Sequence, residues 1–249
     1  MRLPGVGSQR WESLAFVHRQ VDPDLVRTWL PPGLTVDTYD GATWVGLVPF
    51  VMADVRFPPL PAVSGWSTFP ELNLRVYVRD RTGTAGVWFL GLWCTRHLVV
   101  TGTRAAGVPY HHARAAVDAP TTGPWRYRFA ATAGPEPFRV PHQPARRRAL
   151  RFDATVHAHE AVDATSGLAH WLTARWNAYA VRAGRLWRFP VEHEPWTLRR
   201  GVLTSCTTDA FSRLGLPGRP AVGEEPLVHV ADAPVHARFA PPRPVDRAA

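Results

Sequence analysis

Residues 69–78 read FPELNLRVYV, and this stretch decides how the rest of the chain is interpreted. Apolar and polar residues alternate over 72–78, which predicts a β-strand, since side chains alternate between the two faces of a strand. Glu71, Asn73 and Arg75 then share one face. If that face lines a closed cavity, a carboxyl group and a guanidinium lie there with little water, and burial shifts their pKa values. If it meets solvent, it is an ordinary outer sheet face, and the pattern alone leaves both interpretations open.

More strands are predicted on either side of this stretch. After a turn, the nearly continuous apolar run VWFLGLW predicts a buried strand that forms a hairpin with 72–78. Upstream, residues 35–57 predict a hairpin with strands on both sides of the turn Tyr39–Gly41. Three further strands are expected at 125–131, 150–159 and 185–191.

Two helices are predicted between these strands. Residues 22–30 form a short one, with Asp22 as its cap and Pro23 in its first turn. Residues 163–182 form the main helix, because their apolar residues recur at helical spacing and Gly184 can end it. These residues are Leu168, Trp171, Leu172, Trp176, Tyr179 and Ala180.

The predicted elements describe one α+β domain that is mainly antiparallel β. We expect a single domain over 1–249, with a core of about 11–232 and a loose tail rich in Pro and Arg at 233–249. Sheets rich in Trp, Phe and Pro-Gly turns usually curl toward a barrel.

The charge composition argues against nucleic acid as a partner. The formal net charge is +9, with 29 basic residues, all of them Arg. These arginines are spread along the chain, and only Arg146–Arg148 form a run, whereas a nucleic-acid footprint clusters on one face. Without lysine, no Schiff base can form on a lysine side chain.

The sequence also lacks signals for a membrane, a signal peptide or common cofactors. No apolar stretch is long enough to span a bilayer, and the two cysteines lack metal-type spacing. We therefore expect a soluble cytoplasmic protein that needs no cofactor and no metal. His157 and His159 share a strand face, but no third ligand is evident, so they are expected to face solvent.

The residues GVPYHHAR at 107–114 and several other segments resemble one bacterial family. LAFVHRQVDPDLVRTWLPPGLTVDTYDGATWVGLVPFVM, FPELNLRVYV, GVWFLGL, RAAGVPYHHA, RWNAYA and HEPW occur in the order typical of the DUF2071, or YqjF-like, family. That family is grouped with the acetoacetate decarboxylase-like superfamily. The resemblance implies curved sheets in a cone-like barrel around a buried small-molecule pocket.

The resemblance also places functional residues. The conserved glutamate of the decarboxylases falls on Glu71, and their lysine pair falls on Tyr110 and His111, so imine-forming decarboxylation is excluded. The implied catalytic residues are Glu71, Tyr110 and His111. The implied substrate-binding residues are Asn73, Arg75, Trp88 and Arg104, with the aromatic residues Trp44, Phe50 and Trp93 nearby.

Three interpretations of these residues remain. The first is an enzyme that performs non-covalent acid–base chemistry on a carbonyl or carboxylate compound, as a lyase, isomerase or cyclase. The second is a protein that binds a small ligand without turnover. In the third, Tyr110 only packs in the pocket wall while His111 and His112 face solvent. The partner is expected to be a small molecule, and homo-oligomer formation stays open.

Overall fold

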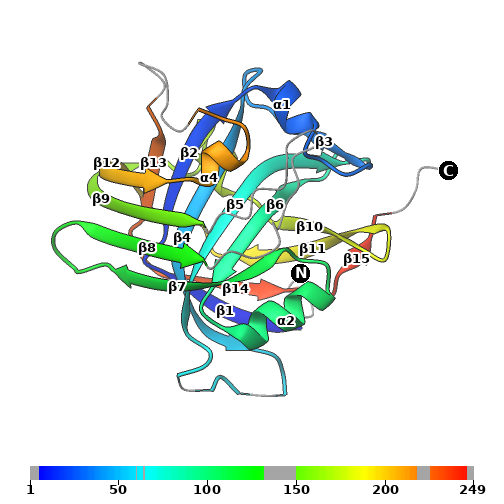
Figure 1. The fold of residues 1–249 in the computed structure, drawn as a ribbon, viewed down its shortest axis with the longest axis horizontal. Helices are drawn as coiled ribbons and strands as arrows, with labels where there is room; N and C mark the ends of the chain where they lie inside the picture. The colour runs from blue at the N-terminus through cyan, green and yellow to red at the C-terminus, as the bar shows by residue number, and fades with distance from the viewer. Residues whose placement is uncertain (1–5, 60, 64, 132–149, 218–224, 246–249) are drawn as a thin grey trace.

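The computed structural model describes residues 6–59, 61–63, 65–131, 150–217 and 225–245. Within these ranges, 15 strands are hydrogen-bonded into one sheet, with short helices at its margins (Figure 1). Nearly all pairings are antiparallel; β6 (Ala85–Cys94) makes the two parallel ones in the described part of the chain, with β7 (Tyr110–Asp118) and with β10 (Asn177–Arg182). The expected mainly antiparallel fold is confirmed.

The sheet closes on itself twice. The first closed ring, called the cavity ring, runs β1–β14–β11–β10–β6–β5–β4 and returns to β1. Its members are β1 (Gly7–Glu12), β14 (Val235–Phe239), β11 (Arg185–His193), β10 (Asn177–Arg182), β6 (Ala85–Cys94), β5 (Phe69–Asp80) and β4 (Thr43–Arg56).

The second closed ring, called the core ring, shares β4, β5 and β6 with the first. It continues through β7 (Tyr110–Asp118), β8 (Trp125–Ala131), β9 (Arg151–Val162), β12 (Leu198–Thr208), β13 (Leu227–Ala231) and β2 (Ala15–Val21). Two short strands attach outside the rings, β3 (Leu34–Val36) on β5 and β15 (Arg243–Pro244) on β11.

The shared strands have both faces buried, which explains the alternation around residue 71. Leu72, Leu74 and Val76 point into the main hydrophobic core, which fills the core ring. Glu71 and Asn73, on the opposite face of β5, point into the cavity ring. The alternation therefore separates a packed core on one face of β5 from a cavity on the other.

Four short helices cover parts of the rings. They are α1 (Pro23–Arg27), α2 (His97–Ala105), α3 (Gly167–Thr173) and α4 (Ala210–Arg213). Asp22 caps α1 by accepting a hydrogen bond from the amide of Asp24, as predicted. No described helix is long and apolar enough to cross a membrane.

The predicted helix over 163–182 is wrong beyond residue 173. Residues 177–182 form β10, which pairs with β11 and β6 at once, and ladder hydrogen bonds on both sides outweigh a helical pattern. Gly184 does not end a helix; with Ala183 it forms a two-residue hairpin turn in which both residues have positive φ, 49° and 70°. The last carbonyl groups of α3 instead accept hydrogen bonds from Arg175 and Trp196.

Two other predictions need correction. The loose tail at 233–249 is wrong for residues 235–244, because β14 pairs with both β1 and β11 in the cavity ring, and Ala237 is buried. The strands on either side of the Tyr39–Gly41 turn exist but do not form a hairpin, since β3 pairs with β5 rather than β4. The predicted hairpin of 72–78 with 87–93 is confirmed by the β5–β6 ladder.

Candidate functional site

A cavity of about 360 Å³ lies within the cavity ring, and all seven strands of that ring contribute to its lining. The lining is mostly apolar, with Phe16, Phe50, Phe89 and Trp196 among its larger side chains. The segment after α2 adds Val108. Concave apolar spaces of this size with a few polar groups are typical small-molecule sites.

A carboxyl group and a phenol meet in the cavity wall. The Tyr110 hydroxyl donates a 2.9 Å hydrogen bond to Glu71 Oε2, and Glu71 is 1% exposed. β5 supplies the carboxyl group, and the first residue of β7 supplies the phenol. Burial raises the pKa of Glu71 to about 8, although the hydrogen bond from Tyr110 opposes this rise. Burial and the nearby Glu71 raise the pKa of Tyr110 well above its ordinary value, so Tyr110 stays a neutral donor.

Two arginines form a second polar region in the cavity lining. The Arg75 and Arg175 guanidinium groups both lie over the Tyr77 ring, 5.7 and 4.9 Å from its centroid. Arg175 donates to Asp37 Oδ2 at 2.6 Å. Arg75 Nη2 makes only long bonds, of 3.4 Å to the Tyr77 hydroxyl and 3.3 Å to the carbonyl of Leu172. The positive charge on Arg75 therefore has no carboxylate partner among the described residues.

Several buried polar atoms of the cavity lining lack hydrogen-bond partners among the described residues. They are Trp11 Nε1, Asn73 Oδ1, Arg75 Nε and Arg175 Nη2. A buried polar atom without a partner costs about 1–3 kcal/mol, so these atoms leave the cavity lining with unused hydrogen-bonding capacity.

The structure brings four of the seven predicted site residues to the cavity, namely Glu71, Asn73, Arg75 and Tyr110. The other three do not line it. Arg104 turns to β7, where it donates to the carbonyl of Tyr110 at 2.7 Å and contacts His111 Nδ1 at 2.9 Å. Trp88 packs against the hydrophobic core on the opposite face of β6.

His111 does not line the cavity either. Successive strand residues point to opposite faces, so Tyr110 facing the cavity sends His111 to the other side, beside Trp93 at a ring distance of 6.1 Å. Burial, followed by the charge of Arg104, lowers the pKa of His111 to about 4. His112 stacks on His97 of α2 at 3.7 Å. Of Tyr110, His111 and His112, Tyr110 alone lines the cavity.

Sequence reasoning missed Arg175, Trp11, Phe16 and Trp196 as lining residues. Arg175 falls inside the predicted helix over 163–182. In the structure it lies in the connection between the end of α3 at Thr173 and the start of β10 at Asn177, which places its side chain in the cavity lining. The aromatic residues are common core side chains, and no spacing distinguishes those that line a cavity from those that fill a core.

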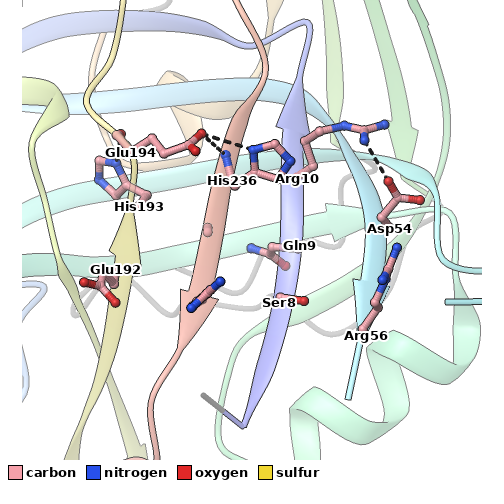
Figure 2. Close-up of a pocket in the computed structure, with 11 residues that line it drawn as sticks. Ser8, Gln9, Arg10, Asp54, Arg56, Glu192, His193, Glu194 and His236 are labelled. Carbon is pink, nitrogen blue, oxygen red and sulfur yellow. Dashed lines mark hydrogen bonds and ion pairs between the residues drawn. The ribbon is translucent and has the colours of Figure 1, made fainter. Parts of the chain in front are cut away.

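A second, open pocket of about 540 Å³ lies on the outside of the cavity ring, across β11, β14, β1 and β4 (Figure 2). Its charged side chains partly neutralise one another: Arg10 pairs with Asp54 at 2.8 Å, and His236 pairs with Glu194 at 3.1 Å. Because these ion pairs are exposed to solvent, the pocket is a weaker candidate than the cavity that holds the buried Glu71.

No group of three potential metal ligands occurs among the described residues. His157 and His159 lie in β9, with His159 exposed and His157 half-buried. The prediction that these histidines face solvent agrees with that placement.

The fold places the protein in the class of acetoacetate decarboxylase-like structures. The enduracididine biosynthesis enzyme MppR, in complex with the condensation product of pyruvate and imidazole 4-carboxaldehyde, matches with a TM-score of 0.63 at 15% identity, covering 98% of this chain and 90% of that chain. An acetoacetate decarboxylase-like enzyme from Sphingomonas wittichii RW1 matches with a TM-score of 0.62 at 13% identity, covering 98% and 94%. Acetoacetate decarboxylase from Legionella pneumophila gives 0.59 at 13%, covering 98% and 89%.

Within that class, the chain belongs to the DUF2071 family of uncharacterized conserved proteins, whose family model matches residues 8–234. The uncharacterized protein YqjF of Bacillus subtilis (strain 168) is 29% identical over 234 residues, which cover 90% of this chain and 86% of that protein. The resemblance inferred from the sequence motifs is confirmed.

Proposed function

We propose that the protein is an enzyme that transfers a proton next to the carbonyl group of a small molecule, with Glu71 as the acid–base group. The observation that carries this proposal is the 2.9 Å hydrogen bond between Tyr110 and Glu71 in the wall of an apolar cavity. Lyase, isomerase and cyclase reactions on carbonyl compounds can all begin with such a transfer.

The environment of Glu71 suits this role. A general acid–base group works best when its pKa lies near the operating pH, and burial holds the pKa of Glu71 at about 8. The carboxylate form accepts a proton from the carbon beside a carbonyl group, and the acid form returns it. Tyr110 donates its single hydroxyl proton to the Glu71 carboxylate and holds it in place. Once Glu71 has taken up the proton, that hydroxyl is free to donate to a substrate oxygen, where negative charge develops.

Two further facts support a carbonyl substrate handled without an imine. Pyruvate, a carbonyl compound, is bound to MppR in a structure that matches this chain with a TM-score of 0.61. The present chain has no lysine, so a covalent imine on a lysine side chain is not available. Acid–base chemistry by Glu71 requires no such bond.

The first prediction concerns isotope exchange. In heavy water, the protein should catalyse the replacement by deuterium of the hydrogens beside the carbonyl group of ketones that end in a carboxylate. Proton NMR measures the rate of this exchange as the loss of the substrate's proton signal. Glu71→Gln should lower the rate at least about 100-fold, because the general base is lost. Tyr110→Phe should lower it about tenfold, because one hydrogen-bond donor is lost. The rate should rise with pH, reach half its limit near pH 8 and level off above that, where Glu71 is ionised.

His111→Gln is the matched control, since His111 neighbours Tyr110 in β7 but does not line the cavity. It should leave the exchange rate unchanged. Equal rates for wild type and Glu71→Gln, with both proteins folded, would contradict the catalytic assignment.

Ligand binding without turnover is the second candidate. It is favoured by the same hydrogen bond, because Tyr110 already occupies Oε2 of Glu71 in the free protein. A compound that raises the melting temperature while its hydrogens do not exchange would support this function instead.

A further inference from the structure

The two arginines of the cavity lining form a site with excess positive charge. Asp37 is the carboxylate that pairs with Arg175, at 2.6 Å, and it is shared with Arg79 at 2.7 Å, whereas Arg75 has no carboxylate partner among the described residues. The Arg175 side chain is 5% exposed, and its Nη2 atom has no partner among the described residues. A buried charge is costly unless it is paired, so this region lacks a negative charge.

The two polar regions of the cavity lie apart along one strand. Glu71 and Arg75 are four residues apart in β5, which corresponds to about 13 Å between their Cα atoms. Arg75 also points away from Glu71, since its nearest partners are Tyr77 and Leu172. Asn73 lies between them, and its Oδ1 atom is buried without a partner among the described residues.

The wall between the two regions is apolar and aromatic. Phe50 and Phe89 line it, and Phe16 lies under the Arg75 guanidinium at 5.3 Å from its ring centroid. An apolar molecular body can rest on these rings, while a guanidinium binds a carboxylate through two parallel hydrogen bonds.

We propose that the molecule bound in the cavity is an elongated apolar monocarboxylate, with its carboxylate against Arg75 and Arg175 and its carbonyl-bearing end beside Glu71. This inference rests on the proposed function and adds the substrate class and the binding orientation. A single carboxylate supplies the missing negative charge. The apolar lining favours an organic acid over a free inorganic anion.

Binding of a matched series of probes tests the carboxylate contact. Phenylacetate, phenylbutanoate and phenylhexanoate, each with its primary amide, are titrated into the full chain by calorimetry, with inorganic phosphate as a further probe. We expect each acid to bind at least about tenfold more tightly than its amide, because the charged hydrogen bonds to arginine are lost in the amide. Affinity should increase with chain length until the molecule spans the cavity.

Two arginine variants locate the contact. Arg75→Gln should remove the tenfold preference for the acid over the amide. Arg79→Gln is the matched control, since Arg79 bonds the same Asp37 but does not line the cavity, and it should keep the preference. Circular dichroism checks that both variants are folded.

The outcomes separate this inference from the proposed function. Equal affinity for acids and amides, tighter binding of phosphate than of the acids, or an unchanged preference in Arg75→Gln would overturn the monocarboxylate assignment. Glu71→Gln should still prefer the acids. If the acids bind as expected but isotope exchange does not depend on Glu71, the ligand class stands and the proposed function fails.

Discussion

At the scale of single residues, Glu71 couples the cavity to the stability of the fold. Its pKa is about 8 in the folded protein against an ordinary value of 4.5. Between these values the folded state binds more protons than the unfolded state, so stability decreases as the pH rises. The stability that the protonated Glu71 carboxyl group retains at low pH is therefore lost as the pH rises from about 4.5 to about 8.

The second prediction follows from this linkage. Glu71→Gln cannot ionise, so its free energy of unfolding relative to wild type should increase from pH 5 to pH 9. The full shift corresponds to roughly 5 kcal/mol at about 1.4 kcal/mol per pKa unit. Urea unfolding at several pH values measures the difference. Parallel pH dependences of the two proteins would show that Glu71 is already ionised at low pH in the folded state.

Tyr110→Phe provides a directional check on the same carboxyl group. The hydrogen bond from Tyr110 lowers the pKa of Glu71, so its removal should raise that pKa further. In Tyr110→Phe, the pH range over which stability is lost should then extend above 8. In Glu71→Gln, this pH-dependent loss of stability should be absent.

At the scale of elements, the connection from α2 to β7 sets the position of Tyr110. Gly107 in this connection has φ of 83°, and an added Cβ would lie 2.3 Å from the carbonyl oxygen of Val181 in β10. Only glycine adopts this conformation readily and permits the close approach. The backbone contact therefore ties the start of β7 to the cavity ring.

The third prediction concerns this connection. Gly107→Ala should destabilise the protein by about 2–4 kcal/mol through backbone strain and overpacking, and it should displace Tyr110 from Glu71. Gly102→Ala in α2 is the control, since a Cβ there meets nothing within 4 Å. The control should gain about 0.5–1 kcal/mol from helix propensity. Thermal unfolding of both variants measures the effects, and equal melting temperatures would contradict the assigned contact.

At the scale of the whole molecule, the two closed rings differ in what they enclose. The core ring is filled by the main hydrophobic core, whereas the cavity ring surrounds an open space. Leu74 belongs to the core and Leu92 lines the cavity, and both are at most 3% exposed. Burial alone does not distinguish them.

The fourth prediction uses this difference. Leu74→Phe should cost about 1–3 kcal/mol, because the packed core has no room for a larger ring. Leu92→Phe should cost little, because the new ring extends into the cavity, and it should weaken binding of the carboxylate probes. Urea unfolding and calorimetry measure the two effects. A large cost at both positions would indicate that the cavity is already filled.

Much of this organisation was predictable from local patterns. The alternation in FPELNLRVYV placed Glu71, Asn73 and Arg75 on one face, and the motif order indicated the family. The predicted helix over 163–182 was wrong beyond residue 173 because the spacing of apolar residues carries no information about strand pairing. Residues 177–182 form β10, which has a paired strand on each side. Arg175 was missed for the same reason.

The sequence by itself determined the positions of β5, β6, β8, β9 and β11, the shared face of β5 and the absence of lysine. Only the tertiary structure decided that this face lines a cavity, that Tyr110 and not His111 reaches Glu71, and that Arg175 joins Arg75. The physical reason is that strand alternation specifies which residues share a face but not what the face meets. That depends on pairings between segments far apart in the chain, such as β1 with β4 and β14, which close the ring around the cavity.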